Sequence, residues 1–210
     1  MVAVLSLQTD LLSALSGPAT FERIPLDSSS WVDVGRGWLP GSDQICCQLA
    51  DGVPWQQRRR RMYDRVVDEP RLTRWYGDDS PLPHPGLYAF RRAISERYGV
   101  PFRAMGLNYY RDGRDSVAFH RDRELRHLDD TLVAILTLGA RRPFLVHPLG
   151  GGRSLDMAPA SGDVLVMGGA CQLRWEHGVP KVSASGPRVS ASVRWAATPA
   201  PPRPGRRRPR

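Results

Sequence analysis

His120 and Asp122 stand two residues apart in the sequence FHRDRE, directly behind an apolar run. On an extended strand, residues i and i+2 point to the same face, roughly 7 Å apart along the chain, so both side chains could bind one metal ion. A histidine with an acid two residues away is also common on protein surfaces. The pair therefore predicts a metal site only if a third ligand joins it.

The third ligand that we expect is His177, which lies in the strand-like sequence LRWEHGVP, 57 residues after His120 (177 − 120). The remaining histidines are less suited to a shared site: His84, His127 and His147. Two imidazoles and one carboxylate that leave positions open form the facial arrangement of non-haem Fe(II) oxygenases. Zinc also accepts this ligand set, so the ligand types alone do not fix the metal.

The sequence RVSASVR begins eleven residues after His177 (188 − 177) and has polar side chains at alternate positions. On a strand, one face carries Arg188, Ser190, Ser192 and Arg194. Arginines inside a barrel are costly to bury unless they pair with anions. A dicarboxylate cosubstrate would provide the anion, because a guanidinium binds a carboxylate through two hydrogen bonds and a nearby serine hydroxyl adds another. A structural salt bridge with an internal Asp or Glu is the alternative.

Most of the sequence around these residues reads as short strands. Apolar runs recur about every 8 to 15 residues between Gly, Pro or Asp: AMGLNYY, SVAFHRD, TLVAILTLG, RPFLVHP, GDVLVMGG, RWEHGVP and RVSASVRWA. Before them, PGLYAFRRAISERYGV has Leu87, Phe90 and Ile94 at near-helical spacing and a stop at Gly99, which predicts an amphipathic helix. We therefore expect a β-sandwich, jelly roll or barrel with helices packed outside it.

The 210 residues are 41% hydrophobic and 24% charged, which is enough for one buried domain with extensions. The formal net charge is +9, and Lys181 is the only lysine. Five arginines lie in the last ten residues, 201–210, so the rest of the chain carries +4 (9 − 5). A polyanionic partner would explain the arginines, and so would a GC-rich genome.

The three cysteines have no spacing that fits a disulfide framework or a cysteine zinc site. The apolar N-terminal stretch lacks basic residues and is interrupted by Asp10, which argues against a signal peptide. No apolar run is long enough to span a bilayer. We expect a cytoplasmic, nucleoid-associated monomer with reduced thiols and no membrane contact.

An arginine run, Arg58–Arg61, precedes two neighbouring aromatic residues, Trp75 and Tyr76. Arginines with exposed aromatics are what nucleic-acid surfaces use, because they combine phosphate neutralisation with base stacking. A solvated helix face with one aromatic core residue explains the same sequence, and taken alone this stretch favours that explanation.

Together these segments resemble a known family. From Glu69 to Trp195 the chain is similar to the AlkB-type Fe(II)/2-oxoglutarate-dependent nucleic-acid demethylases, through EPRLTRWYGD, NYYRDGRDSVAFHRDRE, LTLGARRPFLV, WEHGVPK and PRVSASVR in the family's order and spacing. The resemblance implies an α+β, mainly β fold: a double-stranded β-helix, or jelly-roll core, with helices packed on one side and an N-terminal extension. It also implies Fe(2+), 2-oxoglutarate as cosubstrate and O2.

The resemblance implies a role for each matching residue. The iron ligands, which form the catalytic centre, are His120, Asp122 and His177. The 2-oxoglutarate contacts are Arg188 and Ser190 at the far carboxylate, with Asn108, Tyr110 and Arg194 completing the pocket. The substrate contacts are Glu124 at the exocyclic amine of the damaged base, Trp75 and Tyr76 as stacking candidates, and Arg121, with Arg58–Arg61, Arg111 and Arg114 as further phosphate contacts. Ser190 departs from the family, which usually has asparagine there, so one cosubstrate contact is weakened or passes to a water.

The implied activity is oxidative removal of N-alkyl groups, such as those of 1-methyladenine and 3-methylcytosine, from DNA or RNA, with release of formaldehyde, succinate and CO2. Two other functions stay open: a 2-oxoglutarate-dependent oxygenase acting on a protein or small metabolite, and a nucleic-acid-binding β-barrel without catalysis. We expect an N-terminal extension of helical and loop elements that contributes to the substrate surface (1–68), the oxygenase domain (69–197) and a disordered Pro/Arg-rich basic tail (198–210).

Overall fold

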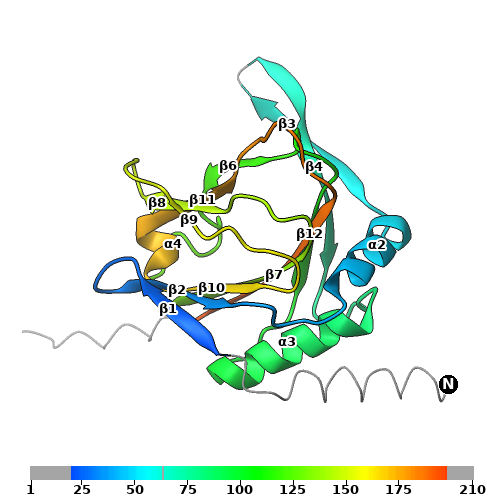
Figure 1. Ribbon diagram of the computed structural model, residues 1–210. Helices are drawn as coiled ribbons and strands as arrows, with labels where there is room; N and C mark the ends of the chain where they lie inside the picture. The colour runs from blue at the N-terminus through cyan, green and yellow to red at the C-terminus, as the bar shows by residue number, and fades with distance from the viewer. Residues whose placement is uncertain (1–19, 63, 198–210) are drawn as a thin grey trace, which may run out of the picture.

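Two β-sheets face each other in the computed structural model, which describes residues 20–62 and 64–197 (Figure 1). The major sheet contains, in spatial order, β1 (Phe21–Pro25), β2 (Ser30–Gly35), β10 (Val164–Gly169), β7 (Thr131–Gly139), β12 (Arg188–Ala196), β5 (Met105–Tyr110), β4 (Arg65–Tyr76) and β3 (Gln56–Met62). The minor sheet contains β6 (Val117–His120), β11 (Trp175–Val179), β8 (Leu145–Pro148) and β9 (Leu155–Asp156). This is the double-stranded β-helix that was predicted, and each predicted strand run forms a strand.

The central strand β12 has two chemically different faces because its side chains alternate. Val189, Ala191 and Val193 point outward and join the hydrophobic core between the major sheet and the helices. The opposite face, which carries Arg188 and the serines, points into the space between the two sheets. There a second core of Val, Leu, Ile, Phe and Met side chains closes one part of the barrel. The alternation that was predicted for RVSASVR is therefore confirmed. One face of β12 packs against the helices, and the other presents the polar side chains to the site.

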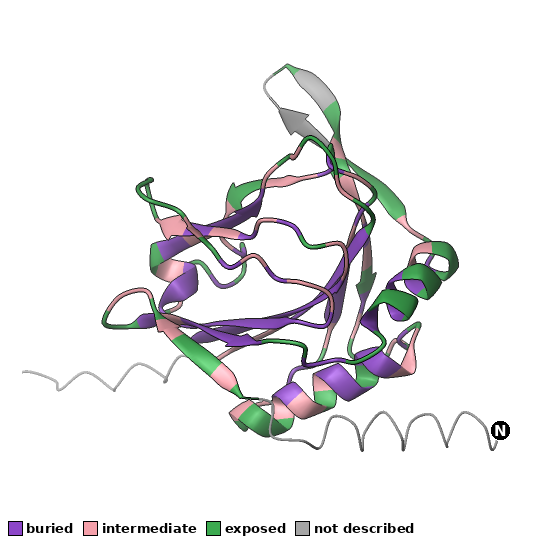
Figure 2. Ribbon diagram, in the orientation of Figure 1, coloured by how far each residue is buried: buried purple, intermediate pink, exposed green. Residues whose placement is uncertain are grey.

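Two helices, α2 (Ser42–Gly52) and α3 (Pro85–Tyr98), cover the outer face of the major sheet (Figures 1 and 2). The predicted helix is α3. It begins where the His84 ring nitrogen Nδ1 accepts a hydrogen bond from the Gly86 N–H, and it ends at Gly99, whose positive φ of 66° suits glycine. Helix α2 was not predicted; within SDQICCQLADG only Ile45, Cys46 and Leu49 are buried apolar residues, too short a stripe to stand out as a periodic pattern.

The arginine run Arg58–Arg61 belongs to a β-hairpin, not to a helix face, so the helix interpretation is wrong. Strand β3 pairs with β4 from Gln56 to Met62, with one irregularity between Gln57 and Arg59. Strand β4 continues past the hairpin and pairs with β5 in the body of the sheet. The hairpin extends away from the rest of the fold, at the top of Figure 1. Sequence periodicity missed the hairpin because QQRRRRM has polar side chains on both faces of the strand, so apolar and polar residues do not alternate.

The expected N-terminal extension contributes strands to the major sheet: β1, β2, β3 and the first residues of β4. The expected boundary between residues 68 and 69 lies inside β4, and β2 pairs with β10. The first 19 residues of the expected N-terminal extension and the tail 198–210 lie outside the described residues. In the described part of the chain, every helix is too short or too polar to cross a membrane.

Candidate iron and 2-oxoglutarate site

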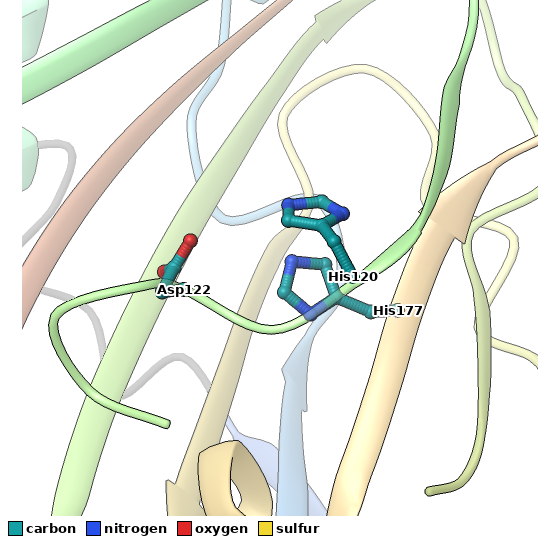
Figure 3. Close-up of side chains that lie close together, drawn as sticks. All are labelled: His120, Asp122 and His177. Carbon is teal, nitrogen blue, oxygen red and sulfur yellow. The ribbon is translucent and has the colours of Figure 1, made fainter. Parts of the chain in front are cut away.

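The three predicted metal ligands come together between the sheets (Figure 3). One ligand atom from each of His120, Asp122 and His177 lies within 4.8 Å of the other two. Strands β6 and β11 pair so that His120 stands opposite His177, and their ring centroids are 4.4 Å apart. Two imidazoles and one carboxylate at such distances can share one cation and leave part of its surface open.

Asp122 reaches this cluster from a loop rather than from a strand. Strand β6 ends at His120, so the expected alternation of one extended strand does not continue to Asp122. Instead, the Asp122 backbone N–H donates to the buried Gln172 Oε1 at 2.8 Å. The Arg121 guanidinium donates to the Leu173 carbonyl at 3.0 Å. The short helix α4 (Cys171–Arg174) thus fixes the loop that presents the carboxylate.

This loop changes two predicted substrate contacts. Arg121 is half-buried, and its Nη1, which donates to Leu173, also approaches the Arg126 carbonyl at 3.3 Å, so one of its nitrogens is engaged by the backbone. Glu124 lies in the exposed turn after Asp122. Glu124 therefore does not share one strand face with His120 and Asp122, as was expected for HRDRE. It is nevertheless accessible to a substrate.

Arg194 is the charge partner of the metal carboxylate. Its Nε lies 2.7 Å from Asp122 Oδ2, and its Nη2 lies 3.2 Å from Oδ1. Burial alone would raise the pKa of Asp122, but Arg194 outweighs it and the pKa is lowered. Burial also lowers the pKa of His177 to about 3. The cluster thus holds an ionised carboxylate and a neutral imidazole, the forms that bind a cation. Arg194 was predicted in the cosubstrate pocket, whereas the structure gives it Asp122 as its partner.

Arg188 is a fully buried cation with free hydrogen-bond donors. Its side chain is 0% exposed, and its Nη2 donates to Thr137 Oγ1 at 3.3 Å. Its Nε and Nη1 find no acceptor among the described residues. Burial lowers the pKa of the Arg188 guanidinium, because the charged form loses its hydration there. The residue fits the far carboxylate of 2-oxoglutarate, which would supply both the countercharge and the missing acceptors.

Small polar side chains form a row across four strands of the major sheet, next to Arg188. Ser190 stands opposite Asn108 on one side and Thr137 on the other, and Asn108 stands opposite Thr73. The Asn108 Oδ1 accepts from Arg71 Nε at 3.0 Å, which leaves the amide N–H groups to donate. Thr73 is 8% exposed, and its hydroxyl has no partner in the described part of the chain. A donor-rich surface beside a buried cation suits a carboxylate ligand.

Comparison with known proteins agrees with this donor set. Residues 80–206 match the 2OG-Fe(II) oxygenase superfamily. The chain belongs to this superfamily. It is 34% identical over 177 residues to the alpha-ketoglutarate-dependent dioxygenase alkB homolog 3 of Mus musculus. The aligned region covers 74% of this chain and 62% of that protein. It is 29% identical over 193 residues to the DNA oxidative demethylase ALKBH2 of Homo sapiens. This alignment covers 80% of this chain and 73% of that protein.

As a member of this superfamily the chain uses Fe(2+), 2-oxoglutarate and O2, and both of these curated relatives are AlkB-type dioxygenases. It spans less than two thirds of the length of alkB homolog 3. The fold extends to more distant oxygenases. A prolyl hydroxylase of Trichoplax adhaerens, solved with a hypoxia inducible factor peptide, superposes with a TM-score of 0.57 over 90% of this chain and 89% of that one, at 10% identity.

The two aromatic residues predicted to stack a base lie on opposite faces of β4 in this oxygenase. Tyr76 is 8% exposed and packs in the core beneath the helices, so it cannot stack a base, and that prediction is wrong. Trp75 is 52% exposed on the inner face. A Cβ added at Gly106 would lie 3.4 Å from the Trp75 ring and 3.3 Å from Ser192 Oγ, so the indole lies over the glycine and beside the serine. Ser192 Oγ is 3.4 Å from Nη1 of Arg194, the residue that pairs with Asp122, so these contacts connect Trp75 to the metal ligands through Ser192 and Arg194.

The remaining histidines have other surroundings, as expected. His84 caps α3, and His127 lies next to Arg126 on the surface. His147 is on β8, but its side chain lies against Phe119, with ring centroids 3.8 Å apart. Because Phe119 precedes His120 on β6, this contact is on the face of the minor sheet opposite to the metal ligands.

Proposed function

We propose that this AlkB-type oxygenase removes N-alkyl groups from bases of DNA or RNA. The similarity to alkB homolog 3 and to the DNA oxidative demethylase ALKBH2 supports the proposal. The observation that carries the substrate class is the exposed Trp75 ring, which lies beside Ser192 on the inner face of the major sheet. A flipped base needs an aromatic surface within reach of the oxidising centre, and a cationic methylated base gains a cation–π attraction there.

His120, Asp122 and His177 would hold Fe(2+), and Arg188 with Asn108 and Ser190 would hold 2-oxoglutarate. Together these cofactors supply oxidation of a C–H bond by O2, during which 2-oxoglutarate becomes succinate and CO2. One oxygen atom enters succinate and the other enters the N-methyl group. The hydroxylated methyl would leave as formaldehyde: the C–N bond breaks, its electron pair returns to the ring nitrogen, and the hydroxyl proton is released to solvent. Arg194 keeps Asp122 ionised and oriented throughout.

Exposed charges around the site suit a nucleic-acid strand. Glu124 in the turn after Asp122 is accessible to the exocyclic amine of a cationic base. Of the arginines expected at phosphates, Arg111 and Arg114 are each ion-paired with a nearby aspartate, which weakens them as phosphate contacts. Arg58 and Arg59 on the hairpin are exposed, although Arg59 lies 3.1 Å from Asp68. We therefore assign the phosphate contacts mainly to the hairpin.

The test uses a 3-methylcytosine oligonucleotide with the full chain, Fe(2+), ascorbate and 2-oxoglutarate, and an Asp122→Ala variant as control. With the wild type, we expect the oligonucleotide to lose one methyl group while one formaldehyde and one succinate are formed. With the control, we expect none of these changes. Succinate formation with an unchanged oligonucleotide would point to a protein or small-metabolite substrate. Binding of the oligonucleotide without succinate would leave a nucleic-acid-binding barrel. We propose a cytoplasmic, nucleoid-associated monomer, which size-exclusion chromatography and cell imaging would check.

A further inference from the structure

Arg142 is a second fully buried arginine, and sequence analysis gave it no role. It follows β7 in the sequence GARRPF and is 1% exposed. Its guanidinium donates to three backbone carbonyls: Asp112 at 2.8 Å, Asp115 at 2.9 Å and Pro180 at 2.8 Å. No carboxylate of the described residues forms an ion pair with it. An apolar side chain of similar size would fill the space without the desolvation cost, so the charge needs another explanation.

The three carbonyls belong to the two loops that connect the site residues. The loop 111–116 leads from Tyr110 to the strand of His120, and the loop 180–187 leads from the strand of His177 to Arg188. The loops also touch directly, since the Val182 N–H donates to the Gly113 carbonyl at 2.9 Å. A Cβ at Gly113 would clash with the Val182 carbonyl oxygen. We call these two loops, held together by Arg142, the loop clamp.

Arg142 also lies near the cation that would receive the cosubstrate. Its guanidinium carbon is 5.9 Å from the centroid of the Tyr110 ring, and that of Arg188 is 5.4 Å from the same centroid. Burial lowers the pKa of both guanidinium groups, and Arg142 further lowers the pKa of Arg188 by repulsion. Two buried positive charges around one ring create a site that an anionic ligand stabilises.

We propose that Arg142 is a positioning residue of the cosubstrate site. Through the loop clamp it holds Tyr110 and the first residue of β12 in the geometry that receives the far carboxylate of 2-oxoglutarate, and its charge adds to the attraction. This inference rests on the 2-oxoglutarate chemistry of the proposed function and not on the nucleic-acid substrate.

The test compares Arg142→Met with Arg141→Met, which removes the exposed arginine next to it. Binding of 2-oxoglutarate to the anaerobic Fe(2+) protein is followed by the visible absorption that a keto acid produces on ferrous iron, and by the rise in melting temperature with ligand concentration. We expect Arg142→Met to weaken 2-oxoglutarate binding about 10-fold and Arg141→Met to leave it unchanged. Pyruvate has the keto acid but no far carboxylate, so its weaker binding should be the same in all three proteins.

Equal loss of pyruvate and 2-oxoglutarate binding in Arg142→Met would mean general loosening and would overturn the proposal. So would unchanged 2-oxoglutarate binding in that variant. If Arg142→Met does not fold, Gly113→Ala tests the same idea, because it pushes the loop clamp apart while keeping both arginines; unchanged 2-oxoglutarate affinity there overturns the proposal. Failure of the wild type itself to bind 2-oxoglutarate would contradict the proposed function instead.

Discussion

Arginines occupy two contrasting regions of this molecule. On the β3–β4 hairpin, Arg58 and Arg59 are exposed and sit in an unbroken polar run. Inside the barrel, Arg142 and Arg188 are each isolated in sequence from acidic neighbours and are almost completely buried. The hairpin arginines cost little to keep and tolerate any anion, whereas a buried guanidinium is retained only where a defined partner repays its desolvation. A single arginine at a strand position therefore indicated a site better than a run of four did.

Replacing Arg188 tests the buried side of this comparison most strongly. Arg188→Met should weaken 2-oxoglutarate binding by roughly 2–5 kcal/mol, about 30-fold or more, because the far carboxylate loses its charged partner. The ligand-free variant should melt at or above the wild-type temperature, since an uncompensated buried cation has been removed. Calorimetric titration of 2-oxoglutarate and thermal unfolding measure the two effects. A ligand-free protein that is strongly destabilised would show that Arg188 is structural.

Arg194 is intermediate, since its side chain is 28% exposed and already has Asp122 as a partner. Arg194→Met should weaken Fe(2+) binding about 10-fold, because the ligating carboxylate loses the group that orients it. Competition with a metal chelator measures this affinity. Arg123→Met, an exposed arginine in the adjoining turn, is the matched control and should bind iron as the wild type does.

The buried imidazole of His177 gives the metal-free protein a pH dependence. Its pKa is lowered from 6.5 to about 3 by burial, so between these values the unfolded chain binds a proton that the folded chain does not. Stability should therefore be fully present above pH 6.5 and decline as the pH falls toward 3, and the lowered pKa of Asp122 acts in the same direction. Urea unfolding at about pH 7 and about pH 5 measures this slope. His177→Leu should flatten it and His127→Leu, on the surface, should not.

The hairpin arginines should show the smallest effect. Arg58→Gln should weaken binding of a methylated oligonucleotide slightly and reduce the salt dependence of log K by about 1, because one phosphate contact is lost. Binding of 2-oxoglutarate should not change. Fluorescence anisotropy at several salt concentrations gives the slope. An altered cosubstrate affinity in this variant would mean that the two regions are coupled.

Strand periodicity predicted the sheet well because both faces of strands such as β12 are buried against different surroundings. The same rule predicted the shared site of His120 and His177, which depends only on neighbouring strands. It failed where the chain leaves regular structure: Asp122 is held by Gln172, a contact 50 residues away in sequence that no local pattern contains. Naming both Trp75 and Tyr76 as stacking candidates ignored the same alternation, because neighbouring residues of a strand point to opposite faces, and only Trp75 is exposed.

Arg142 had no sequence signal that distinguished it from Arg141, its exposed neighbour. Its three acceptors are backbone carbonyls, which any sequence provides, so only the tertiary structure identifies them. The row of Thr73, Asn108, Ser190 and Thr137 was half predicted for a similar reason. Asn108 and Ser190 matched a family motif, whereas the threonines became visible only when the strand order was known.

Strand β4 is one continuous element that runs from the hairpin to Trp75, so its length fixes the distance between these two regions. Arg59 pairs opposite Asp68, which is seven residues before Trp75 (75 − 68). At about 3.4 Å per residue, the two positions are roughly 24 Å apart. A stacked nucleic-acid strand advances about 3.4 Å per nucleotide, so this span corresponds to about seven nucleotides. Under the proposed function, an oligonucleotide shorter than this would reach the indole or the hairpin but not both, so the length of β4 would set the shortest substrate that uses both contacts.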